Sequence, residues 1–312
     1  MAWTVWHLSA LFATAVCFLF PYLRSQRRQD PSLHGSVETA KTADAVQTAG
    51  TVKTRTASAS KVKQPYDAFL VLDVEGTCQQ GSNFDYPNEI IEFPVCLMRW
   101  KDRDGGNASQ LEVIAEFRSF VKPSWRPTLS EFCTELTGIT QDQVDSAPDF
   151  PSMLRSFRAF LVQHKLIGTH GKRILRYCWC TDGPWDIRDF VVKQCFISRI
   201  PFPDWMTGDV LNVRTVVISH TSGSHTSGTQ PQDDRLPKIV TLNIPGQLLA
   251  LGLSPFLGRQ HSGIDDTRNL ARIITQLALE GVSLQPNTTI SLRRRWAWMG
   301  KSGQILEQHL TC

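Results

Sequence analysis

Apolar runs and polar turns alternate between residues 64 and 285, and this pattern predicts the regular elements of that part of the chain. Continuous apolar runs bounded by turn residues predict four buried strands, at 66–77, 89–100, 111–122 and 174–180. Apolar residues at helical spacing, opened by Asp or Pro or closed by Gly, predict five helices, at 129–138, 149–164, 184–196, 244–253 and 263–281. Three antiparallel strands followed by alternating helices and strands predict an α/β fold, with a mixed β-sheet flanked by helices.

The N-terminal residues follow a different pattern. Residues 2–23 contain no Lys, Arg, Asp or Glu and are about long enough to span a bilayer, which takes roughly 20 residues. Arginines follow this apolar run, and positive charge in that position favours the cytoplasmic side for what comes next. We therefore expect residues 1–28 to anchor the chain to a membrane, with the remainder in the cytoplasm or on the cytoplasmic face. A cleaved organellar targeting sequence or a misassigned start is the alternative.

Three other segments fall outside the predicted elements. Residues 29–63 are rich in Thr, Ala and Ser and predict a disordered linker. The low-complexity insertion at 219–237 repeats SHTSG in tandem and predicts a surface loop. The C-terminal tail, 286–312, combines basic and aromatic side chains, namely Arg293, Arg294, Arg295, Trp296 and Trp298. Such a composition suits single-stranded nucleic acid, but a terminal strand with a buried Trp and solvated arginines explains it slightly better.

Composition narrows the class of protein only a little. The 312 residues, 41% hydrophobic and 20% charged, suit one sizeable domain with appendages. A net charge of +4 permits contact with a polyanion without demanding it. The eight cysteines form no CxxC pair, so a zinc finger is not indicated, and we expect reduced core cysteines in a reducing compartment.

The first chemical signal is a pair of carboxylates where an apolar strand ends. Asp73 and Glu75 lie two residues apart, so both point to the same face of the predicted strand. Two buried like charges repel each other, and a divalent cation removes that cost. Mg²⁺ and Mn²⁺ prefer carboxylate oxygens and keep waters that a substrate phosphate can replace. Two solvated acids at an exposed strand end are the alternative.

Two further acidic motifs lie at the starts of predicted helices. In TDGPWD the strand predicted at 174–180 has ended and the chain turns. Asp182 occupies the usual position of a helix cap, whereas Asp186 falls inside the first turn. In HSGIDD, His261 precedes a helix whose first turn carries Asp265 and Asp266, which point in different directions. At most one of the latter two acids therefore faces a common site.

Together these motifs resemble the DEDD exonuclease superfamily in its His-containing, DEDDh, branch, and within it the Eri-1-type exoribonucleases, which include the 3′ histone-mRNA exonuclease. The resemblance covers residues 65–285. The text that carries it is LVLDVEGTC (70–78), NEIIEFPV (88–95), LTGITQDQVD (136–145), TDGPWD (181–186) and HSGIDDTRNLARI (261–273). Such long runs in this order are highly specific. The resemblance implies a ribonuclease H-like fold and a DEDDh exonuclease domain at 64–285.

The resemblance also implies roles for individual residues. The metal ligands would be Asp73, Glu75, Asp186 and Asp266, with His261 as the general base. Two Mg²⁺ ions, for which Mn²⁺ could substitute, would serve the reaction. It would release nucleoside 5′-monophosphates from the 3′ ends of single-stranded RNA, in RNA processing, decay or small-RNA turnover, without a nucleotide cofactor. The terminal nucleotide would contact four residues, Gly76, Thr77, Phe132 and Leu136, although core packing explains the last two equally well.

Two alternatives stay open at this point. A DNA 3′→5′ exonuclease would use the same four carboxylates, and only the closeness to one subgroup favours RNA. An inactive membrane-tethered RNA-binding adaptor belongs to another class of protein, and the occupied catalytic positions argue against it. The region before residue 64 holds an apolar segment and a Thr/Ala-rich tether. We therefore expect no module that reads an RNA stem-loop.

Overall fold

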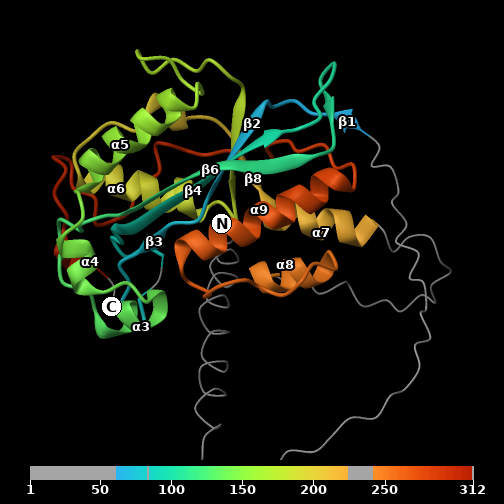
Figure 1. The fold of residues 1–312 in the computed structure, drawn as a ribbon. Helices are drawn as coiled ribbons and strands as arrows, with labels where there is room; N and C mark the ends of the chain where they lie inside the picture. Colours follow the sequence, from blue (N-terminus) through green and yellow to red (C-terminus); the bar gives the residue numbers. More distant parts are fainter. Residues whose placement is uncertain (1–60, 83, 224–241, 311–312) are drawn as a thin grey trace, which may run out of the picture. The chain divides into compact units, whose positions relative to one another are not determined.

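The computed structural model describes residues 61–82, 84–223 and 242–310, whose path is shown in Figure 1. Its centre is a six-stranded sheet in the order β3-β4-β2-β7-β8, with β6 also paired to β4. The strands are β2 (Ala68–Leu72), β3 (Glu75–Gly76), β4 (Ile90–Trp100), β6 (Leu111–Phe120), β7 (Tyr177–Thr181) and β8 (Val210–Asn212). A separate two-stranded ribbon joins β1 (Val62–Lys63) to β5 (Asn107–Ala108).

The sheet is mixed, as the sequence predicts. Strands β2, β4 and β6 pair in antiparallel fashion, whereas β7 runs parallel to both β2 and β8. Residues 186–206, between β7 and β8, contain helical segments, and parallel strands require a crossover connection of this kind. The carboxyl ends of β2 and β7 therefore meet at one edge of the sheet, with Val71 opposite Cys180.

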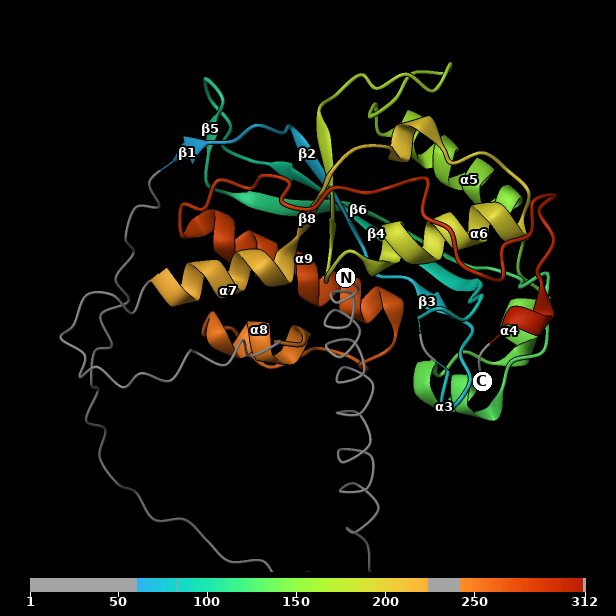
Figure 2. The ribbon, with the colours of Figure 1, turned by 180° about the vertical axis from the view of Figure 1, so that it is seen from behind.

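Alternation along β2 divides the core into two layers. Leu70 and Leu72 point to one face, where they pack with Phe157 of α5 and Ile187, while Phe69 and Val71 point to the opposite face. Figures 1 and 2 show α5 (Phe150–Gln163) and α6 (Val192–Ile197) on the first face. On the second face they show α7 (Val213–Gly223), α8 (Ile244–Ala250) and α9 (Gly263–Leu279). Both faces of the central strands are buried, which explains why β2 and the first nine residues of β4 are fully buried runs.

The helices begin at the capping residues that the sequence offers. Ser130, Thr140 and Asp149 each accept a hydrogen bond from a main-chain N–H at the start of α3, α4 and α5. Gly138, in the left-handed region at φ 73°, ends α3. The helices are α3 (Glu131–Thr137), α4 (Gln141–Asp145), α5 (Phe150–Gln163), η1 (Asp186–Val191), α6 (Val192–Ile197), η2 (Asp204–Met206), α7 (Val213–Gly223), α8 (Ile244–Ala250), α9 (Gly263–Leu279) and η3 (Glu307–His309).

Several predicted elements differ from the structure in extent. The strand expected at 66–77 is interrupted at Asp73 and Val74, because the partner position of Asp73 is Pro94, which has no N–H to donate. The register is the same on both sides of the gap, so Asp73 and Glu75 still share a face. The helix expected at 184–196 opens with one π-helical segment, η1. Short elements with little periodicity, namely α4, α7 and β8, are not predicted.

The boundaries of the flanking segments also need correction. The last residues of the predicted linker form β1, and the first residues of the predicted insertion loop, 219–223, continue helix α7. Residues 1–60, which contain the expected membrane anchor, and 224–241 lie outside the described residues. Within the ranges that are described, no helix combines the length and apolar character needed to cross a bilayer.

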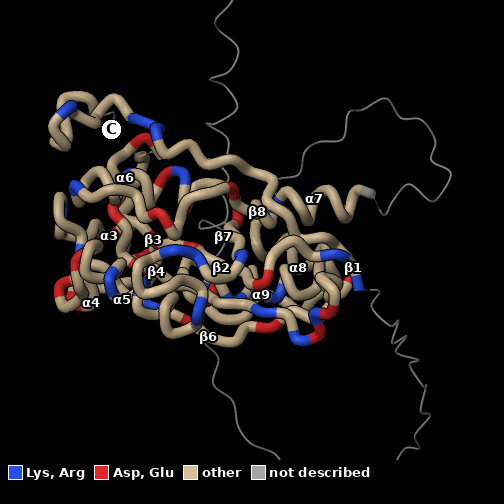
Figure 3. The backbone as a smooth tube through the Cα atoms, turned by 90° about the horizontal axis from the view of Figure 1, so that it is seen from above, with Lys and Arg blue, Asp and Glu red and all other residues tan. Residues whose placement is uncertain are grey.

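The C-terminal tail folds back onto the domain. Trp296 and Trp298 are buried and pack against Val192, Phe196 and Met299. The buried tryptophans were expected, but the terminal strand was not found, because main-chain pairing in the tail is limited to isolated bridges such as Val210 with Thr288. Figure 3 shows that Lys and Arg alternate with Asp and Glu over the described backbone, as the mild net charge suggests.

Candidate active site

The predicted site forms where the carboxyl ends of β2 and β7 meet. After β7 the chain turns at Gly183, whose φ of 100° favours glycine, and enters η1. The turn brings Asp186 back to the end of β2, where its Oδ1 accepts a hydrogen bond from the main-chain N–H of Val74 at 2.9 Å. The motif that contains Asp73 and Glu75 and the motif that contains Asp186 therefore lie side by side.

Helix α9 brings the third motif to the same place. The main-chain N–H of Gly263 donates to Oε2 of Glu92 at 3.1 Å, beside β3. A Cβ atom at Gly263 would lie 2.7 Å from the carbonyl oxygen of Asp73, so the start of α9 packs directly on the end of β2. Asp266, one turn into the helix, is buried, whereas Asp265 turns away and accepts a hydrogen bond from the Arg259 N–H at 3.0 Å.

Acids from all three segments influence one another's pKa values. Burial raises the pKa of Asp73 well above its ordinary value, and the nearby charges of Asp186, Asp266 and Glu75 raise it further. Burial is also the main cause that raises the pKa of Glu75, helped first by Asp266. The pKa of Asp186 rises to about 7 and that of Asp266 to about 8, again chiefly through burial.

These four carboxylates fit a divalent cation. In the part of the chain that the structure describes, none of them forms an ion pair with Lys or Arg. Among the same described residues, no three His, Cys, Asp or Glu side chains already form a complete ligand group, so some side chains would have to turn to coordinate an ion. An uncompensated cluster of buried oxygen donors is nevertheless what Mg²⁺ and Mn²⁺ prefer.

The main chain of His261 lies next to Asp266. It adopts a left-handed conformation (φ 62°), and its main-chain N–H interacts with the Asp266 carboxylate and lowers the pKa of that group. Burial lowers the pKa of the His261 imidazole itself, and the positive charge of Arg259 adds to the effect. This shift favours the neutral imidazole, which is the form able to accept a proton.

Helix α3 borders the site through the main chain of β3. The Cys133 thiol lies 3.7 Å from the carbonyl oxygen of Gly76, and Phe132 and Leu136, one turn apart, are both partly exposed. Arg259 ties this helix to the His261 loop by donating to the carbonyl of Glu135 at 2.8 Å. The two predicted base contacts therefore share a half-exposed helical face at the edge of the site.

Packing explains the glycine at position 76, and hydrogen bonds explain the threonine at position 77. A Cβ atom at residue 76 would lie 2.4 Å from the ring of Phe190, so tight packing alone requires glycine. The Thr77 hydroxyl accepts from the Glu89 N–H at 2.9 Å, and the Thr77 carbonyl accepts from the Asn88 side chain at 2.6 Å. Contact with a terminal nucleotide stays a prediction for both residues.

Sequence reasoning assigned one residue wrongly and missed another. Asp182 does not cap η1: it pairs with Arg214 at 2.6 Å and accepts from Gln247 at 2.7 Å. Glu92 was overlooked, although it is fully buried and links Arg118, at 2.7 Å, to the start of α9. A charged residue inside the apolar run of β4 was the signal that could have identified it.

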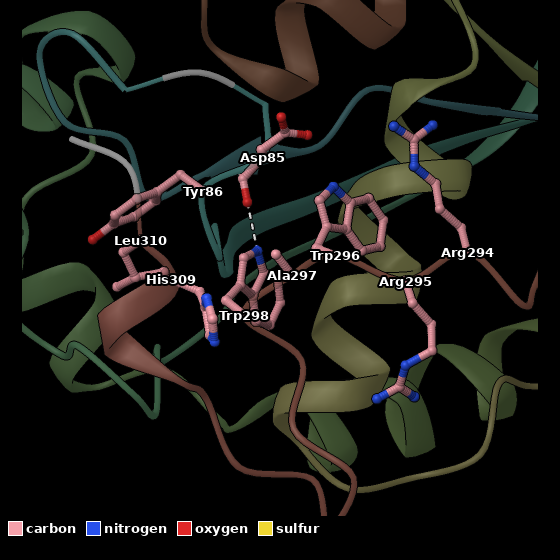
Figure 4. A pocket seen from close by; sticks show the side chains of 9 residues that line it. All are labelled: Asp85, Tyr86, Arg294, Arg295, Trp296, Ala297, Trp298, His309 and Leu310. Atoms are coloured by element: carbon pink, nitrogen blue, oxygen red, sulfur yellow. Dashed lines mark hydrogen bonds between the residues drawn. The ribbon is translucent and has the colours of Figure 1, made fainter. Parts of the chain in front are cut away.

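One pocket lies away from these acids. Figure 4 shows it between the C-terminal tail and the loop before β4, lined by Tyr86, Arg294, Arg295, Trp298 and His309 among others, with a volume of about 320 Å³. None of the predicted catalytic residues lines it. Its place in the molecule is explained by the tail that folds back onto α6.

A helix-flanked mixed sheet with acids from three segments and a histidine defines the class of protein: a DEDDh, RNase T-like exonuclease. The family model RNase_T (Exonuclease) matches residues 70–207. The 3′-5′ exonuclease eri1 of Schizosaccharomyces pombe is 35% identical over 251 residues, which cover 76% of this chain and 74% of that protein. The chain belongs to the ERI1/3′hExo-type exoribonuclease family, a family of 3′→5′ exoribonucleases that typically use divalent metal ions.

Two further comparisons agree. Rat 3′-5′ exoribonuclease 1 is 35% identical over 222 residues, 71% of this chain, and the chain spans only 56% of that relative's length. The solved nuclease domain of 3′hExo, a DEDDh family member bound to rAMP, is 32% identical with a TM-score of 0.59, and the match covers 73% of this chain and all of that one. The expected fold class is therefore confirmed.

Proposed function

We propose that this protein removes nucleotides one at a time from the 3′ end of single-stranded RNA and releases nucleoside 5′-monophosphates, in RNA processing, decay or small-RNA turnover. The single observation that carries the proposal is the meeting of Asp73, Glu75, Asp186 and Asp266 in one partly buried cluster that has no compensating cation among the described side chains. Such a cluster suits metal-assisted attack on a phosphodiester.

The four carboxylates would hold two Mg²⁺ ions, for which Mn²⁺ could substitute. Bound ions of this kind activate water and stabilise the charge on the leaving 3′ oxygen. The protein's contribution is to hold the four acids in place. The Val74 N–H fixes the orientation of Asp186, and the bond from Gly263 to Glu92 fixes the start of the helix that carries Asp266.

His261 would take the proton of the attacking water. The proposal is supported by the lowered pKa of the imidazole, which favours its neutral form, and by the main-chain contact between His261 and Asp266. The loop that carries His261 is joined to α3 through Arg259. Phe132 and Leu136 of that helix would hold the terminal base, with Gly76 and Thr77 beside its ribose.

RNA rather than DNA is proposed because the similar proteins point that way. The rat relative is an exoribonuclease, and the similar nuclease domain is bound to a ribonucleotide, rAMP. The carboxylate cluster itself does not distinguish the two sugars. The substrate preference therefore has to be measured.

The test compares matched RNA and DNA oligonucleotides with free 3′ ends, using the full chain in Mg²⁺, in Mn²⁺ and in EDTA. We expect stepwise shortening of RNA from the 3′ end, 5′-monophosphate products and no reaction in EDTA. Asp73→Asn should abolish the reaction, whereas Asp104→Asn, which changes an exposed acid in a turn, should not. Faster cleavage of DNA would support the DNA exonuclease, and binding without cleavage in either metal would support an inactive adaptor.

We also propose that residues 2–23 attach the protein to a membrane, with the nuclease domain on the cytoplasmic side. The support is the uncharged apolar sequence followed by arginines. Fractionation of cells that express the full chain or residues 29–312 tests this directly. The full chain should sediment with membranes and the shorter one should not; equal distribution of the two would contradict attachment.

A further inference from the structure

One exposed aromatic ring packs on the segment that carries Asp186. Eight large hydrophobic side chains are exposed in the described part of the chain, and Phe84, at 43%, is the only aromatic one. It lies in the loop between β3 and β4. Large apolar rings are usually turned inward, so this exposure needs an explanation.

Phe84 is stacked on the residue that precedes Asp186. Its ring lies nearly parallel to the indole of Trp185, with centroids 6.0 Å apart and an interplanar angle of 15°. The guanidinium of Arg214 lies 5.2 Å from the Trp185 centroid, and the Phe190 ring meets Phe84 edge-on at 6.2 Å. The exposed ring is thus the outermost member of an aromatic stack that begins beside a predicted metal ligand.

The main chain beneath Phe84 is firmly held. The ammonium group of Lys193, which is fully buried, donates to the carbonyl of Phe84, to that of Tyr86 at 2.8 Å and to the Asn88 side chain at 3.2 Å. The indole N–H of Trp298 donates to the carbonyl of Asp85, as Figure 4 shows. The C-terminal tail and α6 therefore fix the loop so that the Phe84 ring keeps a defined position on the surface.

The aromatic stack and α3 reach β3 from different directions. The Cα of Gly76 faces the Phe190 ring, whereas the carbonyl of the same residue faces Cys133 of α3. Phe84 therefore offers an aromatic surface in addition to the half-exposed face of α3. Successive bases of single-stranded nucleic acid stack on exposed aromatic rings without regard to sequence.

We propose that Phe84, supported by Trp185, is the stacking surface for the base of the penultimate nucleotide, immediately 5′ of the scissile phosphate. This inference rests on the proposed function. It assigns a second base-binding position to the same site and gives the C-terminal tail a role in positioning it. Loss of one such stack weakens oligonucleotide binding by about 5- to 150-fold.

The experiment pairs a protein change with a substrate change. Phe84→Ala, Phe84→Tyr and the control Val113→Ala, which alters another exposed side chain, are compared in the full chain. Each variant is given RNA oligonucleotides of one length that are intact, abasic at the penultimate position or abasic five positions upstream. Single-turnover cleavage of the first bond gives the rate at saturation, and fluorescence anisotropy in Ca²⁺ gives the affinity.

Phe84→Ala should weaken binding of the intact RNA and of the upstream-abasic RNA by at least about 5-fold. It should not change binding of the RNA that is abasic at the penultimate position. The cleavage rate at saturating protein should also stay unchanged. Phe84→Tyr and Val113→Ala should match wild type throughout. An equal loss on all three RNAs, or no loss on any, would overturn the proposal. If the wild-type protein cleaves nothing, the proposed function fails, but the anisotropy comparison still decides whether Phe84 stacks on that base.

Discussion

The main-chain N–H of Val74 and the Oδ1 atom of Asp186 are joined by a hydrogen bond of 2.9 Å across 112 positions of sequence. This bond holds the first turn of η1 against the end of β2. It also uses one carboxylate oxygen of Asp186 and leaves the other for a ligand. The bond therefore serves both the fold and the proposed chemistry, and the two contributions can be separated by mutation.

Asp186→Asn and Asp186→Ala should be equally inactive but unequally stable. The amide oxygen of Asn can still accept from Val74, whereas Ala leaves a buried N–H unpaired at a cost of about 1–3 kcal/mol. Both changes remove a metal ligand, for which we expect a loss of at least about 100-fold in kcat. Urea unfolding in EDTA and an RNA cleavage assay measure the two effects; an Asn variant as unstable as the Ala variant would contradict the role of this bond.

The metal-free protein should become less stable as the pH rises towards 8. The folded-state pKa values of Asp186 and Asp266, about 7 and about 8, lie above the ordinary value of 3.8. Between these limits the folded state binds more protons than the unfolded state, so stability falls as the pH rises through 7 and 8. Thermal unfolding in EDTA should give a lower Tm at pH 8 than at pH 6.

Two controls accompany this pH measurement. In the double variant Asp186→Asn/Asp266→Asn the fall in Tm between pH 6 and pH 8 should be smaller, because neither amide titrates. Added Mg²⁺ should raise the Tm of the wild-type protein most at pH 8, where the carboxylates are ionised. If the Tm of the wild-type protein in EDTA rises with pH, ionisation of the four carboxylates does not destabilise the fold, and the prediction is wrong.

His261→Asn should keep the fold and lose catalysis. Asn tolerates the left-handed conformation that His261 adopts, so the loop can form unchanged. Loss of the proton acceptor should lower kcat by about 100- to 10,000-fold. Because burial and Arg259 lower the pKa of His261, the acidic limb of the wild-type kcat profile should lie below pH 6.5. A variant with wild-type kcat would exclude His261 as the general base.

Gly263→Ala should destabilise the domain more than Gly168→Ala does. A Cβ at residue 263 would lie 2.7 Å from the Asp73 carbonyl, whereas the nearest atom to a Cβ at residue 168 is 3.8 Å away. We expect a loss of about 1–3 kcal/mol for the first change, since α9 must move off β2, and little change for the second. The free energy of unfolding from urea titration measures both, and equal values would contradict the close approach of α9 to the site.

The sequence predicted the long periodic elements well and the exceptions poorly. Buried strands such as β4 and amphipathic helices such as α5 and α9 follow from apolar periodicity alone. Other elements depend on pairing between strands, which local periodicity does not reveal. Pro94 interrupts the strand that carries Asp73. Strand β1 pairs with β5, and no local pattern identifies that partner. The low-complexity SHTSG sequence begins inside α7 because its first residues continue that helix.

The sequence identified the residues of the site but not the hydrogen bonds and ion pairs that surround them. Asp73, Glu75, Asp186, Asp266 and His261 stand out by motif, and the structure brings them together. The partners of Asp182 and the bridge made by Glu92 depend on distant segments, so their roles appear only in three dimensions. The same holds for Phe84, which no motif distinguishes and which only its exposure and its stacking on Trp185 identify.

The most direct test of the central claim is anomalous X-ray scattering from a crystal of the protein grown with Mn²⁺. We predict two anomalous peaks, roughly 4 Å apart, coordinated by oxygens of Asp73, Glu75, Asp186 and Asp266 and next to His261. Peaks bound elsewhere, or a carboxylate cluster that holds no ion at saturating Mn²⁺, would contradict the account of this site.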